Sequence, residues 1–80
     1  MVHNNTTLSS SIEANLDKFF QMHDGDSPDS GLYDRVIHEV ERILIIKTLK
    51  HVNGVQVKAA KILGINRNTL RHKIKELNIL

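Results

Sequence analysis

Basic side chains gather at the C-terminal end of this 80-residue chain. Residues 54–80 contain six lysines and arginines against one acid, whereas residues 1–53 contain five basic and eight acidic residues. The net charge of +2 therefore conceals a positive end and a negative end. Arg67 and Arg71 are four positions apart, so on a helix they share one face. Because guanidinium groups bond to guanine edges and to phosphates, this pair makes a nucleic acid the expected partner.

The apolar residues around this arginine pair predict two short helices joined by a tight turn. Ala59 and Ala60 are small enough for two helices to cross closely, and Gly64 can adopt the left-handed backbone of the turn. The predicted core positions of the second helix follow helical spacing: Leu70, Ile74 and Leu77. This is the pattern of a helix-turn-helix, in which the second helix enters the major groove of DNA.

Residues in the first turn of such a second helix face the edges of the bases. The predicted base-contacting residues are Asn66, Arg67, Asn68 and Arg71. Two alternatives stay open at this point: Asn66 is only the N-cap of the helix, and Asn68 only faces solvent. The residues predicted to contact phosphates flank this face or begin the preceding helix, and they are Gln56, Lys58, Thr69, His72, Lys73 and Lys75.

No pattern in the chain predicts catalysis, a metal or a cofactor. His38-Glu39 begins a sequence like the HExxH zinc signature, but Arg42 stands where the second histidine is required. The acidic residues of 24–30 lack the spacing of a calcium-binding loop, so this segment is predicted to be a linker. Glu39 and Glu41 are interpreted as solvated helix charges. We therefore expect a protein that is not an enzyme.

The first half of the chain predicts two helices that have dimerisation as their role. The first is expected over 11–23, with Ser10 and Glu13 as its capping box, after a disordered segment at residues 1–9. The second is expected over 32–52, ended by Asn53-Gly54.

Residues 43–46 make this second helix apolar nearly all round. One other helix and a small terminal motif can hardly cover it on every side, so we expect it to pack on its copy in a homodimer. The predicted interface residues are Ile12, Leu16, Phe19, Phe20, Val36, Ile37, Val40, Ile43 and Leu44. The expected fold is all-α, with residues 10–53 forming the dimerisation helices and 54–80 the helix-turn-helix, and with 10–80 folding as one domain.

The segments AAKILGINRNTLRHKIKELNI and LYDRVIHEVERILI together resemble the Fis family of DNA-binding proteins. They are equally similar to the Fis-type domain that closes NtrC-type transcriptional activators. The resemblance implies a four-helix protomer, an intertwined homodimer and paired recognition helices on an inverted repeat in DNA that is bent. It also implies base contacts for Asn66, Arg67 and Arg71. The positions implied to touch the DNA backbone are Gln56, Thr69, His72 and Lys75.

The chain departs from Fis itself at several positions. Val55 and Val57 stand where Fis has polar phosphate-contacting residues, Glu76 stands in place of a lysine and Ile43 in place of a proline. These differences favour an NtrC-type DNA-binding domain, with further regulator domains possible N-terminal to this chain. The alternatives are a stand-alone Fis-like DNA-bending protein, or a dimerisation domain whose motif no longer binds DNA. A cytoplasmic, nucleoid-associated location is expected, without a membrane-spanning segment.

Overall fold

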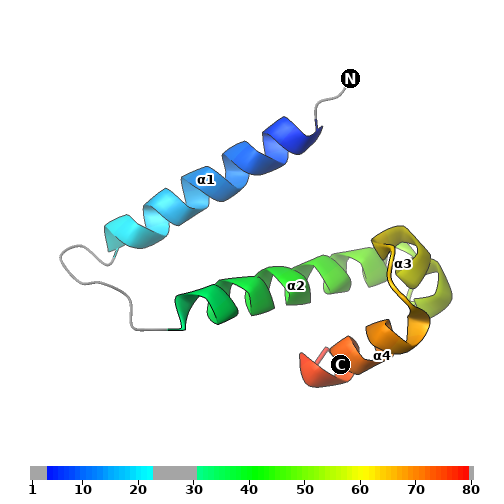
Figure 1. Cartoon of the computed structure of the whole chain (residues 1–80). Helices are drawn as coiled ribbons and strands as arrows, with labels where there is room; N and C mark the ends of the chain where they lie inside the picture. The colour runs from blue at the N-terminus through cyan, green and yellow to red at the C-terminus, as the bar shows by residue number, and fades with distance from the viewer. Residues whose placement is uncertain (1–3, 23–30, 80) are drawn as a thin grey trace. The chain divides into compact units, whose positions relative to one another are not determined.

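The computed structural model describes residues 4–22 and 31–79. This part of the chain contains four α-helices and no strand, which confirms the predicted all-α fold (Figure 1). The helices are α1 (Asn4–Met22), α2 (Leu32–His51), α3 (Gln56–Leu63) and α4 (Arg67–Glu76). The chain divides into two compact units, Met1–Ser30 and Gly31–Leu80. The second unit contains α2, α3 and α4 and therefore holds the predicted helix-turn-helix.

Helix α1 begins seven residues earlier than the sequence predicted. It starts at Asn4, so Ser10 lies inside the helix and is not its N-cap, and residues 4–9 are helical and not disordered. Leu8 lies one turn before Ile12 and extends the same apolar stripe, and no glycine or proline interrupts the segment. The local capping signal was therefore weaker than the continuing helical pattern. Residues 1–3, the predicted end at His23 and the predicted linker 24–30 lie outside the described residues.

Helix α2 matches its predicted bounds to within one residue. Asn53 and Gly54 follow it with φ angles of 57° and 83°, which is the left-handed backbone that ends helices. The N–H of Gly54 donates to the carbonyl of Leu49 at 2.7 Å and satisfies one of the free carbonyls of the last turn. The predicted stop at this pair is confirmed.

The turn between α3 and α4 also has the predicted geometry. Gly64 takes a φ of 74°, and its N–H donates to the carbonyl of Ala60 at 2.9 Å. Ile65 is half-buried and packs against the core beneath the turn. Val55 precedes α3 in an extended conformation and provides no side-chain cap, because valine has no acceptor atom.

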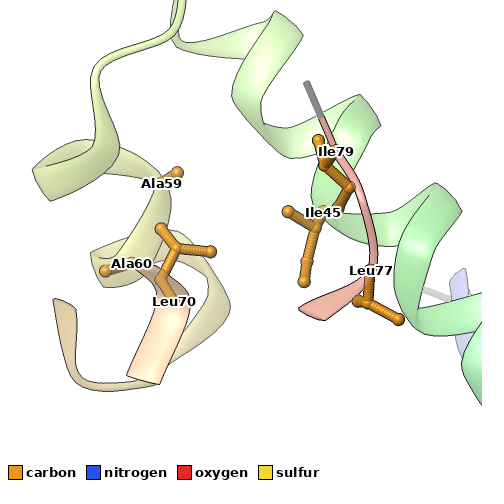
Figure 2. Close-up of a cluster of buried hydrophobic side chains, with 6 residues drawn as sticks. All are labelled: Ile45, Ala59, Ala60, Leu70, Leu77 and Ile79. Carbon is orange, nitrogen blue, oxygen red and sulfur yellow. The ribbon is translucent and has the colours of Figure 1, made fainter. Parts of the chain in front are cut away.

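The core of the second unit joins α2 to the helix-turn-helix (Figure 2). Ala59 and Leu70 are 0% exposed, which confirms the close crossing of α3 and α4. Ile45 of α2 is 2% exposed and belongs to the same cluster as Leu77 and Ile79. The terminal motif therefore covers one side of α2, and the expectation that it can hardly cover every side of this helix is not contradicted.

The remaining apolar side of α2 is not covered by the rest of the second unit. Ile37, Val40 and Leu44 are 46%, 51% and 52% exposed. Ile43 is also exposed, and Val36 is half-buried. In α1, Ile12 and Phe20 are exposed while Leu16 and Phe19 are half-buried. Six of the nine residues predicted for the dimer interface are thus exposed, and whether a second copy covers them stays a prediction.

Candidate nucleic-acid interface

The basic side chains of α4 form a row that is separate from its buried face. At about 100° per residue, Arg67, Arg71 and Lys75 follow one another along one side of the helix, and all three are exposed. Leu70 and Leu77 are buried and lie about 100–120° around the helix from Arg71. Burial of the apolar face therefore fixes which side of α4 presents its guanidinium and ammonium groups to solvent.

Helix α3 contributes to the same surface. A concavity of about 490 Å³ is lined by side chains of both helices, namely Gln56 of α3 and Asn68, Arg71, His72, Ile74 and Lys75 of α4. Five of these six residues were predicted to contact DNA. Asn68 and Arg71 were predicted to contact bases, and Gln56, His72 and Lys75 were predicted to contact phosphates. We call this surface, together with the adjoining Arg67, the basic groove. It brings together residues that are up to 19 positions apart in the chain.

Asn66 is the N-cap of α4. Its Oδ1 accepts a hydrogen bond from the backbone N–H of Asn68 at 2.7 Å, as the predicted cap requires. The bond uses the side-chain oxygen and leaves the amide NH₂ group at the exposed start of the helix. The cap and the predicted base contact are therefore compatible in one side chain.

Two other predicted phosphate contacts lie outside the basic groove. Lys58 is exposed on α3. Thr69 is exposed too, but it is about 160° around α4 from Arg71. Neither residue lines the concavity, so their contacts with DNA stay a prediction.

Lys73 differs from every other predicted contact residue because it is paired within the protein. Its ammonium group forms an ion pair with the carboxylate of Glu41 on α2, and both side chains are about one-third exposed, at 31% and 30%. The hydrogen bond to Glu41 raises the pKa of Lys73 above its usual value, although partial burial opposes this change. Sequence reasoning missed this pair, since it treated Glu41 as a solvated charge. The missed signal is that Lys73 lies about 40° from Leu77 and about 60° from Leu70 on the helical wheel, at the edge of the buried face.

The described residues show neither a metal cluster nor a membrane span. Among residues 4–22 and 31–79, no group of three or more histidine and acidic side chains is placed to hold a metal ion. None of the helices described here is long and apolar enough to cross a membrane.

Comparison with known proteins identifies the family of the chain. Residues 36–77 match the model of the bacterial regulatory proteins of the Fis family. This range covers more than half of the chain and includes all of α3 and α4. The chain belongs to the Fis family. The matched segment contains every residue predicted to contact DNA, and it ends at the buried Leu77.

Individual Fis-family relatives fall into two groups. The DNA-binding transcriptional regulator NtrC of Azospirillum brasilense is 51% identical over 72 residues, which are 90% of this chain and 15% of that protein. A putative Fis-like DNA-binding protein of Neisseria meningitidis serogroup B is 39% identical over 80 residues, which are 100% of both chains. The DNA-binding protein Fis of Aliivibrio fischeri is 39% identical over 69 residues, covering 86% of this chain and 69% of that protein.

These relatives confirm the resemblance that the sequence predicted. The chain thus spans only a small part of the NtrC regulators but the whole of the Neisseria protein. The relatives named here carry the names of DNA-binding regulators and DNA-binding proteins, which agrees with the prediction that this chain is not an enzyme.

Proposed function

We propose that this chain is a sequence-specific DNA-binding module that acts as a homodimer, with α4 in the major groove of each half of an inverted repeat. The basic groove is the observation that carries this proposal. It places Arg71 and Asn68, which can hydrogen-bond to base edges, beside Gln56 and Lys75, which suit phosphates. Exposed polar and basic side chains on the second helix of a helix-turn-helix are the arrangement that reads DNA.

Each proposed contact follows from its position in the basic groove or at its margin. Arg67 and Arg71 share a face of α4, so their guanidinium groups can reach neighbouring base pairs. The amide groups of Asn66 and Asn68 lie at the N-terminal end of α4, which enters the major groove. The proposed phosphate contacts are Gln56, Lys58, Thr69, His72 and Lys75. Lys73 is left out of this set because Glu41 already occupies its ammonium group.

The open side of α2 supports the proposal of a homodimer. Tyr33, Ile37, Val40 and Leu44 are exposed and alternate at intervals of four, three and four residues. This interval is the one at which two packed helices meet along a common seam. Two-fold pairing through this seam gives two copies of α4 in one particle, which matches the symmetry of an inverted repeat. The intertwined arrangement expected from the family resemblance remains part of the proposal.

We propose a stand-alone Fis-like DNA-binding role in preference to the NtrC-type role that the sequence favoured. The end-to-end alignment with the putative Fis-like protein of Neisseria supports this choice. The higher identity to NtrC supports the alternative, in which the module is the DNA-binding part of a larger regulator. Both roles use the same basic groove, and both place the protein at the nucleoid in the cytoplasm.

A DNA-binding titration tests the proposed reading face. Duplexes selected by the wild-type chain from a random library, together with a scrambled duplex, are titrated by fluorescence anisotropy at two salt concentrations. Arg71→Ala is expected to weaken binding to the selected duplex by about 1–3 kcal/mol, since it removes a bidentate base contact. Arg35→Ala, an exposed arginine of α2, is the matched control and should bind normally. Undiminished selective binding by Arg71→Ala would remove α4 from the reading role.

Sedimentation of a Leu44→Asp variant tests the homodimer. Leu44 is 52% exposed, so the substitution leaves the core of its own protomer intact but places a charge in the proposed seam. The variant is expected to sediment as a folded monomer at concentrations where the wild-type chain is a dimer. Arg35→Asp, about 180° away around α2, is the control and should remain dimeric. A folded, still dimeric Leu44→Asp protein would contradict the proposed seam.

A further inference from the structure

One ion pair links the dimerisation helix directly to the recognition helix. Among the described residues, the pair between Glu41 of α2 and Lys73 of α4 is the ion pair that joins two different helices, whereas Arg42 and Glu39 pair within α2. Its two side chains are about one-third exposed, so solvent screens the pair only in part. No other predicted DNA-contacting side chain is tied to α2 in this way.

The ion pair adjoins an apolar contact between the same two segments. Glu41 and Ile45 are four residues apart and share a face of α2, and Lys73 and Leu77 share a face of α4 in the same way. Ile45 and Leu77 are both buried, and Figure 2 shows Leu77 and Ile79 close to Ile45. The apolar contact holds the two segments together without a preferred direction, because burial depends only on area. The ion pair adds the directional contact.

The position of Lys73 on α4 separates it from the reading face. Lys73 is about 160° around the helix from Arg71 and from Lys75. With its ammonium group on Glu41, its side chain extends toward α2. A phosphate contacted by Lys75 is therefore on nearly the opposite side of the helix from the bond that Lys73 makes.

We propose that Glu41 and Lys73 are positioning residues that set the placement of the recognition helix relative to the dimerisation helix, and that Lys73 does not act as a phosphate ligand. The proposal rests on the DNA-binding function proposed above. In a dimer joined through α2, the position of α4 on its own α2 determines how the two recognition helices match the half-sites. A loosened pair therefore reduces the preference for the selected duplex over the scrambled one, while the number of phosphate contacts stays the same.

Neutralising Glu41 gives a test in which a purely electrostatic role and a positioning role predict different results. If Glu41 acts only as a negative charge, Glu41→Gln strengthens binding to both duplexes equally. If it positions α4, the ratio of selected to scrambled affinity falls about two- to fivefold, the range expected for a partly exposed ion pair. Glu39→Gln is the matched control, because Glu39 is 58% exposed and pairs only within α2. Its affinity ratio should equal that of the wild-type chain.

Reversing the pair provides a second test. Glu41→Lys and Lys73→Glu should each lower the affinity ratio, and the double variant Glu41→Lys/Lys73→Glu should recover it to within about twofold. If Lys73 touched phosphate, the double variant would bind as poorly as Lys73→Glu alone, and its dependence on salt would be less steep by about 0.9 in log–log slope. Lys75→Glu changes a lysine on the reading face and is the control, because its binding should show this less steep dependence on salt.

The outcomes separate this inference from the proposed function. A wild-type chain that binds no duplex selectively overturns the proposed function and this inference with it. Selective wild-type binding, together with a defective double variant that is folded by circular dichroism, overturns the inference alone. If the double variant does not fold, the comparison of Glu41→Gln with Glu39→Gln decides, and equal affinity ratios for the two would overturn the positioning role.

Discussion

Asn66 has two assigned roles that a pair of substitutions can separate. Its Oδ1 accepts the N–H of Asn68 at 2.7 Å and caps α4, while its NH₂ group is proposed to contact a base. Asn66→Ser keeps a side-chain oxygen that can cap the helix but removes the amide donors. Asn66→Ala removes both functions. The two variants are therefore expected to differ in stability and to agree in DNA binding.

The magnitudes follow from the structure of the cap. Loss of a single N-cap bond costs about 1 kcal/mol, whereas serine at the same position is nearly equivalent to asparagine. For a domain of this size, Asn66→Ala should lower the unfolding temperature by about 4–8 °C, and Asn66→Ser should leave it almost unchanged. Both variants should lose about 1–3 kcal/mol of binding to the selected duplex. Circular dichroism melting and anisotropy titration measure the two effects separately.

Two results would refute this reasoning. If Asn66→Ser binds the selected duplex as tightly as the wild-type chain, Asn66 is only a cap. If Asn66→Ala melts at the wild-type temperature, the 2.7 Å bond does not contribute to folding stability. Arg35→Ala is the reference for the effect of truncating an exposed side chain, and it should change neither quantity.

Two further predictions concern helix ends and pH. Val55 already has the extended backbone of an N-cap, at φ −77° and ψ 104°. Val55→Ser should therefore add the missing cap of α3 and raise the free energy of unfolding by about 0.5–1 kcal/mol. An unchanged melting temperature would contradict this prediction. The hydrogen bond to Glu41 is the main cause of the raised pKa of Lys73. The stability that this ion pair contributes is therefore complete below the unfolded-state pKa of about 10.4, and it is lost as the pH rises through the raised pKa of the folded state. The melting temperatures of wild-type and Glu41→Gln proteins should therefore converge at strongly alkaline pH, and a constant difference would argue against the pair as its source.

The sequence was sufficient for the parts of the fold that have local causes. The ends of α2, the turn at Gly64 and the cap at Asn66 depend on residues within five positions of each other, and all were predicted. The start of α1 was not predicted, because Ser10 and Glu13 match a capping box whether or not the helix continues through them. A capping pattern shows where a helix can begin, but it does not exclude a start one or two turns earlier.

The parts of the candidate site that depend only on position along α4 could be predicted from the sequence. The apolar positions of α4 define its buried side, so the exposure of Arg67 and Arg71 followed from periodicity alone. The pairing of Lys73 depends on Glu41, which is 32 residues away in the chain and on another helix. Lys73 was predicted to lie beside the reading face as a phosphate contact, and only the packing of α4 against α2 supplies its partner.

The apolar surface of α2 has two neighbouring faces with different surroundings. Ile45 and Leu44 are adjacent in sequence, and their side chains are about 100° apart on the helix. Ile45 is 2% exposed against the helix-turn-helix of its own chain, while Leu44 is 52% exposed. One face of α2 thus fixes α4, and the neighbouring face is free to meet a second copy. Both faces belong to one helix. A change in how Glu41 and Ile45 hold α4 therefore changes the distance between the two recognition helices of the proposed dimer. Variants of the seam should therefore alter the amount of dimer, and variants of the Glu41 face should alter which duplex the dimer prefers.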